Sequence, residues 1–285
     1  MVYICYEHPE DLIELLRSAG VESRGITDVS MLDGDIDFND ATVIVDPSFC
    51  NRDLNRGLIS RMKGVKNIIL YTTSVDWMDT LYAKENGIKV FSIKTYSAIS
   101  VSEYALLLAL SLIRKYKATL LDSKSGTGRD LFGKNVGVIG YGNVGSRIGK
   151  LCQAFGAKVS QYSTADDKDV PYLKLNDLIE QSDVVFCALP NLAETKDLMN
   201  RNLFLLAKPS QIVVSTTDGL LDDDFMIDLV KGQKLGGLAI DWEYSGGEDI
   251  SELNVIYSHH SAYNTTDADE RSDLEIRDLV LQCVK

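Results

Sequence analysis

A short apolar run at residues 136–139 leads into a glycine loop with the spacing of a phosphate-binding turn. In this spacing the first glycine permits a tight turn and the second lets backbone N–H groups approach a pyrophosphate. The third allows the following helix to pack against the strand. A helical pattern follows directly, so the positive end of a helix would face the phosphates. The predicted cofactor contacts of this loop are Gly140, Tyr141, Gly142, Asn143, Val144 and Gly145.

The residues after the next predicted strand, Lys158–Tyr162, bear on which dinucleotide is bound. An acidic residue normally ends this strand and binds the adenosine ribose hydroxyls, but here Ser163 and Thr164 follow it. A neutral residue leaves space for the 2′-phosphate of NADP. However, no arginine follows to bind that phosphate, and Asp166 and Asp167 would repel it. The sequence therefore leaves NAD and NADP as alternatives.

Short β-like runs alternate with helical patterns along the chain, which predicts parallel sheets covered on both faces. We expect an α/β fold with two doubly wound domains. The expected strands are Val2–Tyr6, Thr42–Asp46, Asn67–Tyr71, Lys89–Ile93, Asn135–Tyr141, Lys158–Tyr162, Asp183–Leu189, Gln211–Thr216, Leu235–Asp241 and Asn254–Ser258. Helices are expected at Pro9–Ala19, Asp53–Lys63 and Trp77–Glu85.

The joint between the two domains is expected at Ser97–Leu121. A helix beginning at Glu103 within this segment is apolar nearly all round. Such a helix should be buried on every side, either between the domains or against a second subunit.

Composition narrows the class of protein. A chain of 285 residues with a net charge of −13 is acidic, which disfavours duplex nucleic acid or an anionic membrane as a partner. The N-terminus has no basic region typical of a signal peptide, and the longest apolar run is about half the ~20 residues that span a bilayer. The 5 cysteines form no CxxC pair, which favours reduced thiols, no metal site and a cytoplasmic protein.

Several separate motifs together resemble one known family. They are the segments 87–105, 132–145, 188–200, 236–241 and 254–260. From Asn67 onward the chain resembles the D-isomer-specific 2-hydroxyacid dehydrogenases, which include phosphoglycerate, glyoxylate and D-lactate dehydrogenases. The resemblance implies an NAD(P)-dependent oxidoreductase that transfers hydride to or from a small-molecule substrate.

The resemblance also implies a discontinuous architecture, with a Rossmann cofactor domain inserted into a flavodoxin-like substrate domain. Residues 1–98 and 264–285 would form the substrate domain, and residues 99–263 the NAD(P)-binding domain. Family members are typically homodimers, and the interface would be the helix at residues 100–118. Carried over by motif, the further cofactor contacts would be Leu189, Pro190, Thr195, Thr216, Thr217, Asp241 and His260.

Hydride transfer to or from a 2-hydroxy acid requires a base, a cation for the carboxylate and an acid that orients the base. His260 matches the family's histidine and would be the general acid/base. Asp218 stands where the family has arginine, and it would repel a substrate carboxylate. The usual glutamate position holds Gly246, so Glu248 or Glu243 would have to replace it.

The family's substrate-carboxylate loop also differs here. Hydroxyl-bearing residues replace its glycines, and Lys94 or Arg114 could supply the missing cation. The predicted substrate contacts are Thr72, Thr73, Ser74, Val75 and Lys94. These departures leave three readings: an active oxidoreductase with an atypical substrate, a conventional 2-hydroxyacid dehydrogenase with a relocated cation, and a catalytically impaired dinucleotide-binding regulatory protein.

Overall fold

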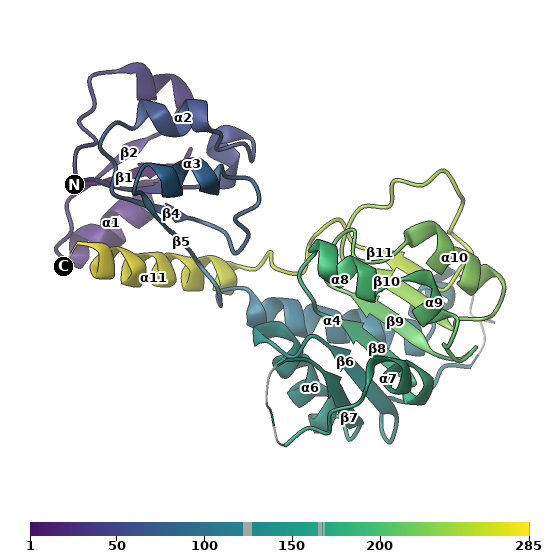
Figure 1. Cartoon of the computed structure of the whole chain (residues 1–285). Helices are drawn as coiled ribbons and strands as arrows, with labels where there is room; N and C mark the ends of the chain where they lie inside the picture. Colours follow the sequence, from purple (N-terminus) through teal and green to yellow (C-terminus); the bar gives the residue numbers. More distant parts are fainter. Residues whose placement is uncertain (122–126, 165–166, 168, 285) are drawn as a thin grey trace. The chain divides into compact units, whose positions relative to one another are not determined.

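A computed structural model describes residues 1–121, 127–164, 167 and 169–284. The chain divides into two compact units, in which residues 98–264 are inserted between residues 1–97 and 265–285 (Figure 1). Ala98 and Asn264, assigned from the sequence to the outer domain, belong to the inserted unit.

The first unit is a five-stranded parallel sheet. Its strands are β1 (Val2–Cys5), β2 (Ser23–Ile26), β3 (Thr42–Val45), β4 (Asn67–Leu70) and β5 (Lys89–Ser92), in the order β2-β1-β3-β4-β5. The helical segments are α1 (Glu10–Ser18), η1 (Val29–Asp33), η2 (Pro47–Cys50), α2 (Arg56–Arg61), α3 (Thr80–Glu85) and α11 (Thr266–Cys283). The sequence did not predict β2, because this edge strand is short, polar and only partly buried.

Alternating residues of these strands enter two separate cores, as the twofold periodicity of a strand requires. Tyr3 and Cys5 of β1 pack on the face covered by α2 and α3. Val2 and Ile4 pack on the opposite face, against α1 and α11. The C-terminal helix α11 is therefore an integral layer of the first unit, although it follows the inserted unit in the sequence.

The second unit is a six-stranded sheet in which every neighbouring pair is parallel. Its strands are β6 (Asn135–Ile139), β7 (Lys158–Tyr162), β8 (Val184–Cys187), β9 (Ile212–Ser215), β10 (Gly237–Ile240) and β11 (Val255–Tyr257). The helices are α4 (Ala98–Ile113), α5 (Tyr116–Leu121), α6 (Asn143–Ala154), α7 (Leu175–Gln181), α8 (Ala193–Leu198), α9 (Arg201–Phe204) and α10 (Asp223–Lys231).

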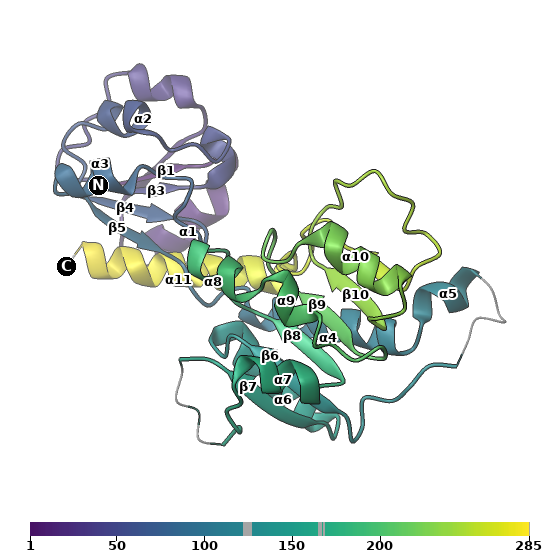
Figure 2. The same ribbon diagram turned by 45° about the vertical axis from the view of Figure 1, so that its right-hand side comes forward.

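Helices cover both faces of this second sheet, as Figures 1 and 2 show. Helices α4 and α6 pack together on one face. Helices α7, α9 and α10 pack on the other. The expected α/β fold with two doubly wound domains is confirmed.

The strand order β11-β10-β9-β8-β6-β7 places a topological switch point beside β6. From β6 the chain first moves outward to β7, and then crosses back to β8 on the other side. In open α/β sheets, ligands bind at the carboxyl ends of the strands beside such a point. The glycine loop that follows β6 therefore lies where this topology provides a ligand site.

The helix expected at residues 100–118 is not continuous. Helix α4 ends at Ile113, and Lys115 adopts a left-handed backbone with φ of 52° before α5 begins at Tyr116. Leu107 of α4 is 55% exposed in the single chain, so burial of this helix on every side would require a second subunit.

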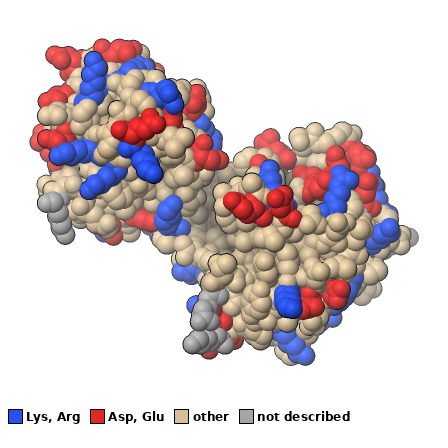
Figure 3. Space-filling view, in the orientation of Figure 1, with Lys and Arg blue, Asp and Glu red and all other residues tan. Residues whose placement is uncertain are grey.

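The surface carries charges of both signs (Figure 3), and four of the cysteines are buried. On the face shown in Figure 3, acidic and basic side chains are interspersed on the surface of each unit. Cys5, Cys50, Cys152 and Cys187 are buried free thiols, and burial raises the pKa of Cys152 and of Cys187 to about 12. Such thiols are poor nucleophiles at neutral pH.

Neither a metal cluster nor a membrane-spanning helix is found in the described part of the chain. It contains no group of three or more His, Cys, Asp or Glu residues placed to hold a metal ion. Nor does any helix there have the length and apolar character needed to cross a membrane.

Candidate active site

The glycine loop has the geometry of a cradle for a phosphate group. Gly140 has φ of +87°, and a Cβ atom there would lie 2.6 Å from the carbonyl oxygen of Ala188. A Cβ at Gly145 would overlap the carbonyl oxygen of Gly140. Gly142 differs from both, because a Cβ at this position would meet no protein atom within 4 Å. The outer glycines are therefore required by packing, whereas the middle one faces open space.

Helix α6 begins directly after Gly142, which is its N-cap residue. Asn143 and Val144 form the first turn, so their N–H groups lie at the positive end of the helix. Tyr141 points inward and is buried; a Cβ at Gly149 would clash with its ring. Burial raises the pKa of the Tyr141 phenol. The Tyr141 side chain packs beneath the loop in the protein interior, so a dinucleotide would contact the Tyr141 backbone.

The end of β7 borders a hollow of about 410 Å³. Ser163 is half-buried and Thr164 is exposed, while Asp166 lies outside the described residues. The ring of Tyr162 lies 5.9 Å from that of Tyr172. The hollow is lined by Tyr162, Tyr172, Lys174, Leu175, Asn176, Asp177 and Leu198. Sequence reasoning missed Lys174, because it lies beyond the loop and enters this region only through the packing of α7.

The loops that follow β8 and β9 are hydrogen-bonded to each other. The Thr217 hydroxyl donates to the Leu189 carbonyl oxygen at 2.8 Å. The side-chain amide of Asn191 donates to the Asp218 carbonyl oxygen at 2.9 Å. The remaining predicted contacts belong to the same two loops. The Thr195 hydroxyl donates to the Pro190 carbonyl oxygen at 2.5 Å. The Thr216 N–H donates to the Cys187 carbonyl oxygen at 3.3 Å.

Asp218 lies in an acidic environment. Asp222, Asp223 and Asp224 follow it at the start of α10. The pKa of Asp223 is raised by burial and then by the neighbouring carboxylates, including Asp218. This loop is therefore poorly suited to bind a substrate anion.

The turn that carries His260 is held by a buried carboxylate. His259 and His260 both have φ of 51°, a left-handed conformation that costs about 1 kcal/mol or more at each such residue. Asp241, at the end of β10, is 2% exposed and accepts three hydrogen bonds from the turn. The donors are the Ser258 hydroxyl at 2.9 Å and the N–H groups of Ser261 and Ala262 at 2.8 and 3.0 Å. These bonds offset the unfavourable backbone and fix the turn.

The imidazole of His260 lies close to two aromatic rings. The Trp242 ring centroid lies 4.4 Å from it, and that of Tyr263 lies 5.0 Å away in an edge-on arrangement. Sequence reasoning did not select Trp242. Its position directly after Asp241, at the carboxyl end of the strand beside β11, is the signal that could have identified it.

The two glutamates considered as orienting acids are engaged elsewhere. Glu248 forms an ion pair with Lys231 at the end of α10. Glu243 lies 3.6 Å from the Nδ1 atom of His259, and both side chains are largely exposed. An exposed pair of this kind contributes little energy.

In the first unit, the structure brings two of the predicted substrate contacts together. The Thr72–Val75 segment follows β4, and Lys94 follows the adjacent strand β5. The Lys94 ammonium donates to the Thr73 carbonyl oxygen at 3.4 Å. The hydroxyl of Ser74 is bonded to Asp76.

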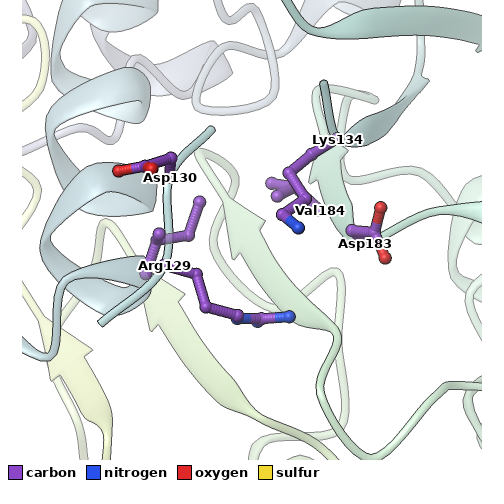
Figure 4. A pocket seen from close by; sticks show the side chains of 6 residues that line it. Arg129, Asp130, Lys134, Asp183 and Val184 are labelled. Carbon is purple, nitrogen blue, oxygen red and sulfur yellow. The ribbon is translucent and has the colours of Figure 1, made fainter. Parts of the chain in front are cut away.

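The pocket in Figure 4 lies at the opposite, amino-terminal edge of the second sheet, where β6 and β8 begin. Asp183 accepts a hydrogen bond from the Asn135 N–H at 3.0 Å and lies 3.6 Å from the Lys208 ammonium. These contacts tie strand ends together. Arg114, considered as a substitute cation, directly follows Ile113, which lines this pocket. It is therefore distant from the edge that carries the glycine loop.

Comparison with known proteins identifies the family. The model for the D-isomer specific 2-hydroxyacid dehydrogenase, NAD binding domain, matches residues 106–262. A D-2-hydroxyacid dehydrogenase (NAD+) from Lacticaseibacillus paracasei is 33% identical over 237 residues, covering 72% of this chain and 71% of that protein.

Solved structures share the fold. The structure of D-2-hydroxyisocaproate dehydrogenase has a TM-score of 0.82 at 25% identity, covering 100% of this chain and 96% of that one. D-lactate dehydrogenase from Aquifex aeolicus, solved with NAD and lactic acid, has a TM-score of 0.78 at 24% identity, covering 99% and 95%.

The chain thus belongs to the D-isomer-specific 2-hydroxyacid dehydrogenase family, a class of NAD(P)-dependent dehydrogenases and reductases that act on CH–OH groups. This confirms the family, cofactor class and enzyme class expected from the sequence. The glycine cradle also fits that cofactor, because it leaves open space at Gly142 beside the N-terminus of α6.

Proposed function

We propose that the protein transfers hydride between a nicotinamide cofactor and a hydroxy or keto substrate, with His260 as the general acid/base. One observation carries this proposal: the glycine loop after β6 and the His260 turn after β11 stand on the carboxyl edge of a single parallel sheet. The sheet therefore presents a phosphate cradle and a proton-transfer group on one side of the unit.

Each segment of that edge would have a defined role. The N–H groups of 140–145 would hold the pyrophosphate, and Ser163 with Thr164 would contact the adenosine ribose. The loops at 189–195 and 216–217 would flank the rest of the cofactor. The bound nicotinamide supplies the hydride donor or acceptor.

The imidazole of His260 would exchange a proton with the substrate oxygen. Asp241 would support this proton exchange indirectly. Its hydrogen bonds fix the turn, and the turn sets the direction of the imidazole. Trp242 limits the rotation of the ring by packing against it. A histidine constrained in this way needs less reorganisation at the moment of proton transfer.

Substrate recognition would be atypical for the family. Asp218 replaces the expected arginine, and its acidic surroundings disfavour an anion there. We assign the substrate contacts instead to Thr72, Thr73, Ser74, Val75 and Lys94 in the first unit. We assign no catalytic step to Asp218 or Glu248. Because Glu248 is paired with Lys231, we assign the orientation of the His260 turn to Asp241.

The cellular setting and assembly belong to the same proposal. We place the protein in the cytoplasm, which is consistent with its free thiols. We also propose a homodimer, because α4 and α5 expose the large apolar side chains Leu107, Tyr116 and Leu120.

The test combines binding and turnover. Fluorescence titration with NADH and with NADPH would determine which cofactor binds, and a panel of 2-oxo acids and neutral ketones would detect turnover. For His260→Gln we expect kcat to fall about 10²- to 10⁴-fold. His259→Gln, with the same backbone conformation at the neighbouring position, should retain activity.

Two outcomes would contradict this function. If the protein binds a dinucleotide but reduces no compound of the panel, the regulatory alternative is favoured. If His260→Gln retains full turnover, another group transfers the proton.

A further inference from the structure

We infer that Lys174 binds the 2′-phosphate of NADP and makes the protein select NADP over NAD. This inference rests on the proposed function and deepens it, because it names the dinucleotide that the sequence leaves open. The observation that carries it is the presence of a cation, Lys174, in the lining of the hollow at the end of β7.

The hollow lies beside the glycine loop. Tyr162, the last residue of β7, lines the hollow, and it pairs with Ile139, the last residue of β6. The glycine loop starts directly after Ile139. A dinucleotide whose pyrophosphate lies in that loop would therefore place its adenosine at the end of β7, where the hollow begins.

The end of β7 lacks the side chain that selects NAD. An acid directly after this strand would bind the ribose hydroxyls and repel a 2′-phosphate, but this position holds Ser163. Farther along the loop, the Asp167 carboxylate accepts a hydrogen bond from the Asp169 N–H at 3.0 Å. Lys174 is the one cation among the described residues that line the hollow. Its ammonium has no ion-pair partner within the described part of the chain.

Gln161 holds the segment that leads to Lys174 against β7. The Gln161 N–H donates to the Pro171 carbonyl oxygen, and the Leu173 N–H donates to the Gln161 carbonyl oxygen, both at 2.9 Å. The Gln161 side chain is buried, and its amide donates to the Asp167 carbonyl oxygen at 3.0 Å. These bonds fix the backbone just before Lys174, so little further ordering of the chain is needed when the ammonium binds an anion.

Two tyrosine rings supply a surface for the adenine base. The ring centroids of Tyr162 and Tyr172 lie 5.9 Å apart, with an angle of 31° between the ring planes. A parallel bridge between Gln161 and Tyr172 places Tyr172 alongside the last residues of β7. Tyr172 is 56% exposed, so part of its ring can stack with a base. The hollow therefore combines an aromatic surface with a cation, which suits a 2′-phosphorylated adenosine.

Asp177 is the one acid among the described residues that line the hollow. A carboxylate there would repel a phosphate, whereas it could accept the hydroxyls of an unmodified ribose. We assign the 2′ position to Lys174, because the segment held by Gln161 ends directly before it. Asp177 lies about one turn farther along, within α7, and has the shorter side chain.

The direct test uses probes that lack the nicotinamide. Adenosine 2′,5′-bisphosphate and AMP differ only in the 2′-phosphate, and each would be titrated by calorimetry into the full chain. We expect the wild type to prefer the bisphosphate about 10-fold or more, the gain typical of one charge-assisted hydrogen bond. Lys174→Ala should abolish this preference and leave the affinity for AMP unchanged. Lys174→Arg should retain it, because a guanidinium also binds phosphate.

Two further variants control for charge. Lys158→Ala removes an exposed ammonium at the other end of β7, and it should bind both probes as the wild type does. Asp177→Asn should strengthen binding of the bisphosphate and leave that of AMP unchanged, because a repulsive charge is removed. Weaker binding of AMP by Asp177→Asn, with no preference for the bisphosphate in the wild type, would assign the site to NAD and overturn the inference.

The outcomes separate this inference from the proposed function. Lys174-dependent binding of the bisphosphate without turnover of any ketone or 2-oxo acid would support the site and contradict the oxidoreductase function. Turnover with the same kcat/KM for NADH and NADPH, unchanged in Lys174→Ala, would do the reverse. Equal affinities of the wild type and Lys174→Ala for the bisphosphate would also overturn the inference.

Discussion

At the scale of single residues, the three glycines of the cofactor loop are not equivalent. Gly145 lies against the carbonyl oxygen of Gly140, whereas Gly142 has no neighbour within 4 Å. A methyl group added at Gly145 therefore tests a requirement of the fold, whereas one added at Gly142 tests a requirement of ligand binding.

We predict that Gly145→Ala lowers the free energy of unfolding by about 1–3 kcal/mol, the usual cost of overpacking. Gly142→Ala should leave stability within about 0.5 kcal/mol. It should nevertheless weaken dinucleotide binding about 10-fold or more, since hydrogen bonds to a charged phosphate would be lost. Urea unfolding and fluorescence titration would measure the two effects. Equal loss of stability in both variants would contradict this reading of the loop.

At the scale of elements, α11 is joined to the first sheet by a polar pair. The Tyr71 hydroxyl, just beyond β4, is hydrogen-bonded to the Asp273 carboxylate, and the Ser272 hydroxyl donates to the Tyr71 oxygen at 2.9 Å. Burial is the largest cause that raises the pKa of Asp273 above 3.8. Burial likewise raises the pKa of Tyr71. The hydrogen bond from Tyr71 favours the ionised carboxylate, but burial outweighs it, so the folded protein favours the protonated form of Asp273.

A dependence of stability on pH follows from this raised pKa. Below pH 3.8 the carboxyl is protonated in both folded and unfolded chains. As pH rises through the folded pKa, the unfolded chain ionises first and stability is lost. We predict that the unfolding free energy of the wild type, relative to Asp273→Asn, falls between pH 4 and pH 7. Urea unfolding at the two pH values measures this difference, and an unchanged difference would contradict it.

At the scale of the whole molecule, the second unit exposes apolar side chains that a single chain leaves uncovered. Leu107 of α4 is 55% exposed, and Leu120 of α5 is 69% exposed. Isolated apolar side chains are common on protein surfaces. Leu107, however, lies on a helix whose remaining residues are predominantly apolar, which favours burial against a second copy.

We predict that Leu107→Glu converts the proposed homodimer into a monomer, because a carboxylate would be buried without a partner. Light scattering coupled to size-exclusion chromatography would measure the mass. Leu81→Glu, at a 70% exposed position of α3 in the first unit, is the matched control and should not change it. A wild-type mass equal to one chain would contradict the homodimer.

Local patterns were sufficient to predict the parts of this protein that depend on neighbours in the sequence. Apolar runs identified all strands except β2, whose polar residues give no such signal. The glycine spacing identified the turn after β6, since Gly140 adopts a left-handed backbone and Gly145 lies against the carbonyl oxygen of Gly140. The segment 100–118 was misjudged as one helix because the left-handed backbone at Lys115 leaves no mark in the apolar pattern.

The sequence by itself thus determined the fold class, the family and the cofactor loop. Only the tertiary structure decided how the functional side chains are held. Asp241 reaches the His260 turn across 21 residues, and Glu275 reaches Lys94 across 181. Such contacts are set by which strands and helices become neighbours, and strand order cannot be read from local periodicity. For this reason the sequence could name Lys94 as a candidate cation, whereas the packing of α11 against the first sheet gave it a fixed position.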